Sequence, residues 1–214
     1  MYKKKPFFIV FEGVEGCGKS FQSKKLYNKL KKLKIDTILT REPGGTKSSE
    51  LIRNLILKDY FVKNASEKFD KYTDTLLYLA ARNEHIKNKI KPALIKKKVV
   101  ICDRFTDSTI AYQHYGLGVN LDLIKYINKF LLKGIKPNFT FLNIVNSKNM
   151  KLRLQDRKKL NRYDKFDLKF YDKVQKGFIK LAKKDKKHYK IINSNKSISE
   201  NKKVIIKQIN SLIR

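Results

Sequence analysis

Residues 13–20 read Gly-Val-Glu-Gly-Cys-Gly-Lys-Ser, the G-x-x-x-x-G-K-[ST] pattern of a phosphate-binding loop. An apolar run over 7–11 precedes it and a helical pattern with leucines at 26, 30 and 33 follows it, which is the context that the motif requires. In such a loop backbone N–H groups and the lysine bind phosphates, and the serine hydroxyl holds Mg²⁺. A chance match in a glycine turn is the alternative. The residues expected to bind a nucleoside triphosphate are Gly13, Val14, Glu15, Gly16, Cys17, Gly18, Lys19 and Ser20.

Two further strand-like runs end in charged residues. Arg41 follows the run at 37–40, and Asp103 and Arg104 follow the run at 99–102. An aspartate after four apolar residues is typical of a strand that holds Mg²⁺ directly or through water, although aspartate is also common at strand exits. Because ligands bind at the carboxyl ends of parallel strands, we expect Lys19, Arg41 and Arg104 around one crevice that accepts two anionic groups.

The elements that position these residues follow from the apolar periodicity. Strands are predicted at 7–11, 37–40, 99–102, 139–145 and 189–192. Helices are predicted at 20–34, 47–58, 69–91, 121–133, 147–157, 168–186 and 199–213, with Pro92 interrupting or ending the third. This alternation predicts an α/β fold, a five-stranded parallel sheet with helices on both faces, in one domain over 1–214. Residues 158–166 are polar and aperiodic, which predicts a mobile loop.

The chain carries 51 basic and 19 acidic residues, a net charge of +32. Such a charge alone suggests nucleic acid. The lysines, however, are spread along the whole chain, as a strong A/T coding bias would produce, so a nucleic-acid partner is not expected. Where lysine is the general surface charge, an arginine points to bidentate recognition of phosphate or a base, with Arg214 and Arg153 interpreted as surface residues. The arginines are Arg41, Arg53, Arg82, Arg104, Arg153, Arg157, Arg162 and Arg214.

No run approaches the ~18 apolar residues of a membrane span, and the N-terminus continues directly into the first strand. Neither a membrane partner nor a signal peptide is therefore expected. The two cysteines, Cys17 and Cys102, do not indicate a disulfide scaffold, and a cytoplasmic location is the expectation. His85, His114 and His188 lack metal-ligand spacing and are interpreted as structural or exposed.

Together these motifs resemble those of the thymidylate kinase family, over nearly the whole chain. The resemblance depends on the loop at 11–20, Thr-Arg-Glu-Pro-Gly-Gly-Thr at 40–46, Tyr-Leu-Ala-Ala-Arg at 78–82, Asp-Arg-Phe at 103–105 and Ser-Thr-Ile-Ala-Tyr-Gln at 108–113. The Arg-Glu-Pro-Gly-Gly stretch with Asp-Arg-x and Ser-x-x-x-Tyr is distinctive of the bacterial family. The resemblance implies a P-loop kinase fold with a mobile lid at about 153–166. It also implies transfer of the γ-phosphate of ATP, with Mg²⁺, to dTMP.

The resemblance also implies roles for single residues. Glu15 faces the sugar 3′-hydroxyl, Tyr78 stacks on thymine, and Arg82 bonds the exocyclic oxygen of the base. From the residues alone, an exposed acid, core packing and a surface ion pair are the respective alternatives. The arginines at 53 and 104 correspond to those on the acceptor phosphate, and the duty of the one at 41 is open. The implied dTMP-binding residues are Glu15, Arg41, Arg53, Tyr78, Arg82, Arg104, Ser108, Thr109, Tyr112 and Gln113.

One branch of the family has an arginine inside the P-loop, where this chain has Gly16. The other branch supplies the arginine from the lid, and Arg153, Arg157 and Arg162 lie in or beside residues 158–166. The chain thus resembles the lid-arginine type, with Arg157 favoured for the role. Family members are homodimers, so a homodimer is implied, to which the apolar helix around 76–80 could contribute. The implied catalytic residues are Lys19, Arg104, Arg157 and Glu15, and the implied metal ligands are Ser20 and Asp103.

Two other functions remain open at this point. One is another nucleoside or nucleotide kinase of the same fold. The other is a basic P-loop protein that binds nucleic acid through the basic, aromatic-containing stretch at 165–187. That stretch is also typical of an amphipathic helix with a solvated lysine face, which is the interpretation we favour.

Overall fold

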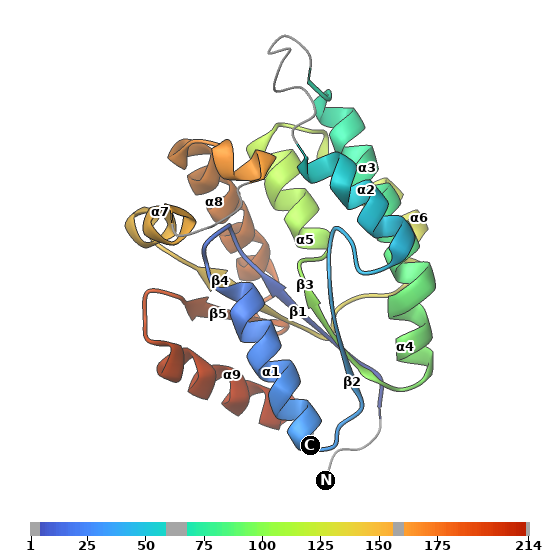
Figure 1. Ribbon diagram of the computed structural model, residues 1–214, viewed down its shortest axis with the longest axis vertical. Coiled ribbons are helices and arrows are strands. Elements are labelled where there is room, and N and C mark those ends of the chain that lie inside the picture. Colours follow the sequence, from blue (N-terminus) through green and yellow to red (C-terminus); the bar gives the residue numbers. More distant parts are fainter. Residues whose placement is uncertain (1–4, 59–67, 156–160, 213–214) are drawn as a thin grey trace.

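The computed structural model describes residues 5–58, 68–155 and 161–212 (Figure 1). Five parallel strands form one sheet in the order β2-β3-β1-β4-β5. The five-stranded parallel sheet predicted from the sequence is confirmed, and no strand end differs from its prediction by more than one residue. The strands are β1 (Phe7–Glu12), β2 (Thr37–Arg41), β3 (Val99–Asp103), β4 (Phe139–Ile144) and β5 (Tyr189–Asn193).

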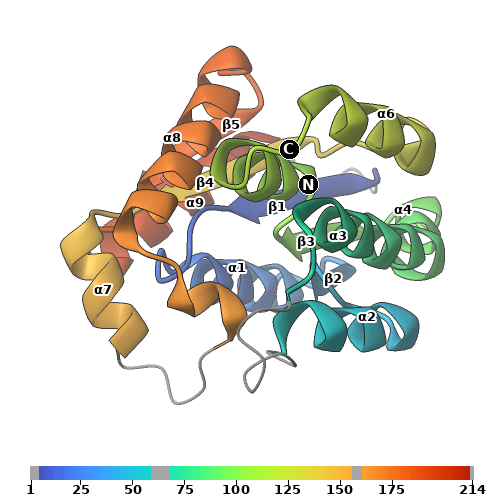
Figure 2. The same cartoon turned by 90° about the horizontal axis from the view of Figure 1, so that it is seen from above.

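Helices cover both faces of the sheet (Figure 2). Side chains of β1 alternate between the faces: Ile9 and Phe11 pack with α1 (Lys19–Lys32) and α9 (Ile198–Leu212), whereas Phe8 and Val10 face the opposite side. Because both faces are buried, the strand reads as an unbroken apolar run. The remaining long helices are α2 (Lys47–Leu57), α3 (Lys71–His85), α6 (Leu121–Leu132), α7 (Ser147–Gln155) and α8 (Leu168–Lys184).

The helix predicted at 69–91 consists of three pieces. After α3, a π-helical turn, η1 (Ile86–Ile90), is followed by α4 (Lys91–Ile95). Pro92 is the second residue of α4, directly after the π-helical turn, so its missing N–H falls where the hydrogen-bond pattern already departs from that of an α-helix. The helix therefore continues past Pro92, and its hydrogen-bond pattern changes just before that residue.

One helical segment was not predicted. Residues 106–116 form a short helix, α5 (Thr106–Thr109), and a π-helix, η2 (Ile110–Gly116), which packs against α8. A Cβ on Gly177 of α8 would lie 2.5 Å from the Tyr115 ring, so glycine permits this close contact. Threonine, serine and glycine are weak helix formers, so tertiary packing rather than propensity supports this segment.

Of the loop predicted over 158–166, residues 158–160 lie outside the described residues and residues 161–166 have a defined conformation. Residues Arg162–Lys165 form a 3₁₀ turn, η3, whose cap Asn161 accepts a hydrogen bond from the Tyr163 N–H at 2.8 Å. The Tyr163 side chain is buried, with 3% of its surface exposed. Polar neighbours hide this single buried aromatic residue in the sequence, which is why the pattern indicated a loop.

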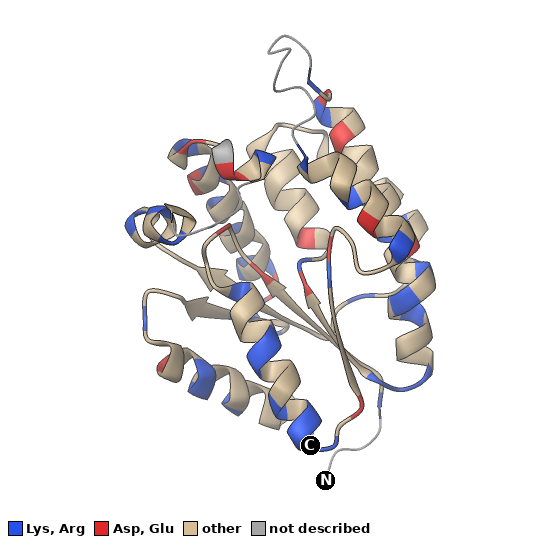
Figure 3. Cartoon of the chain, in the orientation of Figure 1, with Lys and Arg blue, Asp and Glu red and all other residues tan. Residues whose placement is uncertain are grey.

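The charge of the chain is distributed rather than concentrated. Lysines and arginines lie on helices on both sides of the sheet (Figure 3). Within the described residues, no helix has both the length and the apolar character needed to span a bilayer. Both cysteines are buried free thiols, as the sequence indicated.

Candidate active site

A cavity of about 250 Å³ lies where β1, β2 and β3 end. All ten residues implied for dTMP line it, as do Lys19, Ser20 and Asp103. The crevice predicted around Lys19, Arg41 and Arg104 is therefore present. Six further lining residues were not assigned to the site from the sequence: Glu42, Pro43, Leu57, Phe105, Asn161 and Tyr163.

The P-loop has the backbone geometry that its glycines predict. Gly13 has φ +140°, and a Cβ there would lie 2.3 Å from the Asn143 carbonyl oxygen. Gly18, with φ +81°, caps the start of α1 in the left-handed region. Lys19 is buried and donates to the Val14 carbonyl at 3.3 Å, with the Glu15 carboxylate 3.8 Å away. The loop thus holds its lysine inside the concavity that an anion would occupy.

Arg104 connects the P-loop to the helical segment after β3. Its guanidinium donates to the Gly13 carbonyl at 2.7 Å and to Glu15 Oε1 at 2.6 Å. It also donates to Ser108 Oγ and Tyr112 Oη, both at 3.2 Å, and lies 5.0 Å from the centre of the Tyr112 ring. Glu15 is therefore not an exposed loop acid: it pairs with Arg104 at the mouth of the P-loop.

Two more arginines bring positive charge to the same cavity. Arg53 donates to the Pro43 carbonyl at 2.6 Å, and exposed Arg41 pairs with Glu50 at 3.1 Å. Burial lowers the pKa of Arg53, and the nearby positive charges of Arg41 and Arg104 lower it further. The charges of Arg41 and Arg104 thus repel that of Arg53, and an anion bound among the three guanidinium groups would relieve that repulsion.

Arg82 does not form a surface ion pair, which was the alternative interpretation from the sequence. Its side chain is 2% exposed, and its Nε donates to Glu42 Oε2 at 2.8 Å. The remaining bonds of its guanidinium go to Asn128 Oδ1, the Phe105 carbonyl and Thr109 Oγ1. Four of the five N–H groups of an arginine are thereby used. Arg82 lines the cavity from a buried hydrogen-bonded network.

Glu42 is the centre of that network and the most informative residue that sequence reasoning missed. Its second oxygen lies 3.1 Å from His85 Nδ1, and His85 Nε2 lies 2.6 Å from Thr40 Oγ1. His85 is fully buried, so its structural interpretation is confirmed. Burial opposes ionisation of Glu42, but Arg82 and His85 outweigh it and lower its pKa below the usual value. The Arg-Glu-Pro-Gly-Gly motif contained this residue without indicating its partners.

The helical segment after Arg104 supplies one side of the cavity. Ser108 donates to Glu12 Oε2 at 2.6 Å, and Gln113 donates to the Tyr163 hydroxyl at 3.2 Å. Tyr78 comes from α3 opposite and is only partly buried, so it is not a pure core residue. Thr109 and Tyr112 lie on the same helical segment, and both also line the cavity.

Oxygen donors for a metal ion are present beside the P-loop. Asp103 Oδ1 is buried without a hydrogen-bond partner among the described residues, and the Ser20 side chain lines the same cavity. Mg²⁺ prefers oxygen ligands and is usually bound by one or two protein groups together with nucleotide phosphates. The residues present therefore fit a Mg²⁺ ion.

The lid arginines have different surroundings. Exposed Arg153 donates to the Gly16 carbonyl at 3.1 Å and to the Ser194 carbonyl at 2.7 Å, so it fastens the P-loop to the end of β5. Arg162 pairs with Asp74 on α3. Arg157 lies outside the described residues. Each arginine of the described ranges thus contacts the cavity, the P-loop or the residues beside the cavity.

A P-loop at the end of β1 and a second cationic subsite across the same cavity define a P-loop phosphotransferase with an anionic acceptor. Comparison with known proteins narrows this class. A model of the thymidylate kinase family matches residues 11–205. The chain belongs to the thymidylate kinase family.

Individual relatives agree with this assignment. The chain is 38% identical over 200 residues to thymidylate kinase of Sulfurihydrogenibium sp., covering 94% of this chain and 95% of that protein. It is 40% identical to thymidylate kinase of Wolbachia pipientis wMel, covering 91% and 94%. The crystal structure of thymidylate kinase from Ehrlichia chaffeensis is 35% identical and superposes with a TM-score of 0.76 over 96% of this chain and 99% of that one.

Proposed function

We propose that this chain transfers the γ-phosphate of ATP to dTMP, giving dTDP, a step toward dTTP. Family membership supports the reaction. The observation that carries the proposal is the convergence of Arg41, Arg53 and Arg104 on the cavity that Lys19 of the P-loop also lines. Two phosphate-bearing ligands facing each other require this distribution of positive charge.

The P-loop is the proposed ATP side of the cavity. Its backbone N–H groups and Lys19 bind the β- and γ-phosphates and neutralise charge that develops during transfer. Ser20 and Asp103 are the residues that would hold Mg²⁺, which supplies further charge neutralisation on the phosphates when bound. Glu15, which pairs with Arg104, is proposed to accept a hydrogen bond from the 3′-hydroxyl of the dTMP sugar.

The opposite side of the cavity is the proposed dTMP site. Arg104 and Arg53 hold the acceptor phosphate, with Arg41 at the exposed rim. Tyr78 stacks on the thymine ring and Arg82, with one N–H left, bonds its exocyclic oxygen. The residues proposed to line the base and crowd the sugar 2′ position are Ser108, Thr109, Tyr112 and Gln113.

The proposed chemistry needs alignment more than acid–base help. The acceptor phosphate oxygen is already anionic at neutral pH, so no general base is required. Phosphoryl transfer then depends on holding the two phosphates in line and stabilising their charge, which Lys19 and Arg104 do from opposite sides. The lid, with Arg157 as its proposed arginine, would exclude water and suppress ATP hydrolysis.

The function is tested by a coupled assay with a panel of acceptors. We expect kcat/KM for dTMP to exceed that for GMP and CMP by roughly a hundredfold or more, because a buried polar site rejects ligands that leave its groups unpaired. The activity should disappear when Mg²⁺ is chelated. Comparable efficiency on GMP or CMP would contradict the proposal, and a preference for UMP or deoxythymidine would favour another kinase of this fold. Salt-sensitive DNA binding without dTMP kinase activity would favour the nucleic-acid alternative.

We also propose that two copies associate through α2, α3 and α6, which lie together on one side of the molecule (Figures 1 and 2). Each helix presents an apolar stripe to solvent at helical spacing. On α6, Tyr126 is 75% exposed and Phe130 is 70% exposed. A patch of this kind is typical of a protein interface. The stripes consist of Leu51, Leu55, Tyr72, Leu76, Ala80, Leu123, Tyr126 and Phe130.

The predicted cytoplasmic location stays a prediction.

Introducing charge into this patch is expected to yield monomers. The double variant Tyr126→Glu and Phe130→Glu places two negative charges from each copy in an apolar contact. Sedimentation velocity at micromolar concentration measures the outcome. Ile198→Glu on α9, also an exposed apolar residue at 58%, is the matched control and should leave the dimer intact. A wild-type protein that sediments as a monomer would refute the proposal.

A further inference from the structure

Tyr163 forms a wall of the cavity that comes from a separate part of the chain. Among the described lining residues, only Asn161 and Tyr163 lie beyond Gln113 in the sequence. The Tyr163 ring meets two other lining rings edge to face, with centroids 6.0 Å from Tyr78 and 5.8 Å from Tyr112. Three tyrosines therefore enclose one end of the cavity, and one of them is supplied by the turn η3.

The Tyr163 side chain is anchored by polar contacts at its buried end. Its hydroxyl donates to Asp74 Oδ2 at 2.6 Å and accepts from Gln113 at 3.2 Å. Asp74 is 3% exposed and also pairs with Arg162. Burial raises the pKa of Tyr163 well above its usual value, and Tyr78 and Asp74 raise it further, so the hydroxyl stays a donor.

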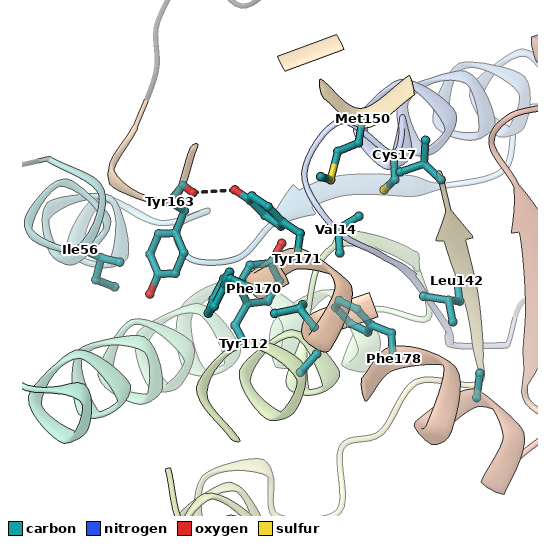
Figure 4. Close-up of a cluster of buried hydrophobic side chains, with 14 residues drawn as sticks. Val14, Cys17, Ile56, Tyr112, Leu142, Met150, Tyr163, Phe170, Tyr171 and Phe178 are labelled. Atoms are coloured by element: carbon teal, nitrogen blue, oxygen red, sulfur yellow. Dashed lines mark hydrogen bonds between the residues drawn. The ribbon is translucent and has the colours of Figure 1, made fainter. Parts of the chain in front are cut away.

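The backbone of the same residue is held as well. The Tyr171 hydroxyl donates to the Tyr163 carbonyl at 2.5 Å (Figure 4), and Asn161 caps the turn. Figure 4 also shows the Tyr163 ring grouped with Tyr112 and Phe170. Core packing alone would be satisfied by phenylalanine. A buried hydroxyl bound to a buried carboxylate on another helix is a more demanding arrangement.

The anchor is located on the helix that carries the proposed base contacts. Asp74, Tyr78 and Arg82 are spaced by four residues and so lie along one face of α3. Asp74, which binds the Tyr163 hydroxyl, lies one helical turn before Tyr78, whose ring is proposed to stack on thymine. Any ligand that pushes Tyr163 aside must break its bonds to Asp74 and Gln113 together.

From this arrangement we propose that Tyr163, positioned by Asp74, is a specificity-determining wall that limits the base subsite to a single pyrimidine ring. The proposal rests on the proposed dTMP kinase function. A purine ring needs more room, and gaining it at this end displaces Tyr163 from its partners. A lost hydrogen bond to a buried charged group corresponds to about tenfold to a hundredfold in affinity.

The test compares Tyr163→Ala, Tyr163→Phe and Asp74→Asn with the wild type on dTMP and dGMP. Tyr163→Ala should narrow the preference for dTMP, measured as the ratio of kcat/KM values, by at least about tenfold. Tyr163→Phe and Asp74→Asn keep the aromatic ring but weaken the hydrogen bonds that hold it, so they should narrow the preference for dTMP less than Tyr163→Ala does. Calorimetric dissociation constants for the two nucleotides give a readout independent of catalysis.

Tyr189→Phe is the matched control because it likewise removes a tyrosine hydroxyl that donates to a carboxylate, that of Asp107, and neither residue lines the cavity or contacts Tyr163. It should keep the wild-type preference. Equal losses on dTMP and dGMP in Tyr163→Ala, with the ratio unchanged, would reduce Tyr163 to a structural role and overturn the proposal. If Tyr163→Ala does not fold in thermal unfolding, an unchanged ratio in Tyr163→Phe and Asp74→Asn overturns it. A wild type without dTMP preference would instead refute the kinase proposal.

Discussion

Arg104→Ala is expected to lower kcat/KM for dTMP by about 10²–10⁴-fold. The terminal N–H groups of Arg104 contact Gly13, Glu15, Ser108 and Tyr112, so a phosphate held by two of them replaces the two longer bonds, to Ser108 and Tyr112. Each bond to a charged group contributes about 1.5–3 kcal/mol. Arg104 also holds Glu15 and the Gly13 carbonyl, so its loss loosens the wall between the two ligands. Steady-state kinetics with each substrate varied, and calorimetry with dTMP and ATP, measure the effect.

The backbone geometry and one control variant make this prediction specific. Arg104 has φ +71°, and because alanine also carries a Cβ, the exchange adds no backbone strain of its own. Arg41→Ala removes a charge from the exposed rim, where 54% of the side chain is exposed, and should cost far less. Equal weakening of ATP and dTMP, or an equal loss in Arg41→Ala, would place Arg104 outside the acceptor-phosphate site.

Arg157→Ala is expected to lower kcat by about 10³-fold while the KM for dTMP stays nearly unchanged. An arginine that acts only on the transferring group stabilises the transition state and not the bound substrate. Arginine fingers contribute on the order of 10³–10⁵ in rate, and neighbouring cations should bring this one to the lower bound. Arg157→Lys should recover little, because an ammonium cannot reproduce the planar fork.

The comparison with the two neighbouring arginines decides this assignment. Arg153 binds the P-loop carbonyl of Gly16 and Arg162 pairs with the carboxylate of Asp74, so the described contacts of both arginines hold protein groups in place. Arg153→Ala and Arg162→Ala should therefore lower kcat less than Arg157→Ala. Near-normal kcat in Arg157→Ala, with a collapse in either control, would transfer the role to that neighbour.

The strands and their ends were predictable because a parallel sheet buried on both faces requires uninterrupted apolar runs. Charged residues at the ends of such runs, Lys19, Arg41 and Arg104, must then meet at one edge. Family resemblance extended this to single lining residues. The scarcity of arginine was informative too, since four of the six arginines in the described ranges line the cavity.

The unpredicted parts depend on contacts between distant segments. The sequence around Asp74 shows only an acid in an apolar helix, and nothing near it indicates Arg162 or Tyr163 as partners. The same holds for the Glu42 bonds to Arg82 and His85. Most of residues 106–116 are weak helix formers, so their helical state follows from packing against α8.

The concentration of arginine at this cavity makes the side chain a natural chemical marker. A dicarbonyl reagent that modifies guanidinium groups, and spares the lysines, would report on the four arginines that line the cavity, with exposed Arg153 as a reference outside it. Among the arginines that line the cavity, Arg41 should react first because 54% of its side chain is exposed, whereas Arg82, at 2%, is shielded by the fold. Protection of single arginines by ATP or by dTMP would then map each subsite by mass spectrometry, in the unaltered protein and without a substitution.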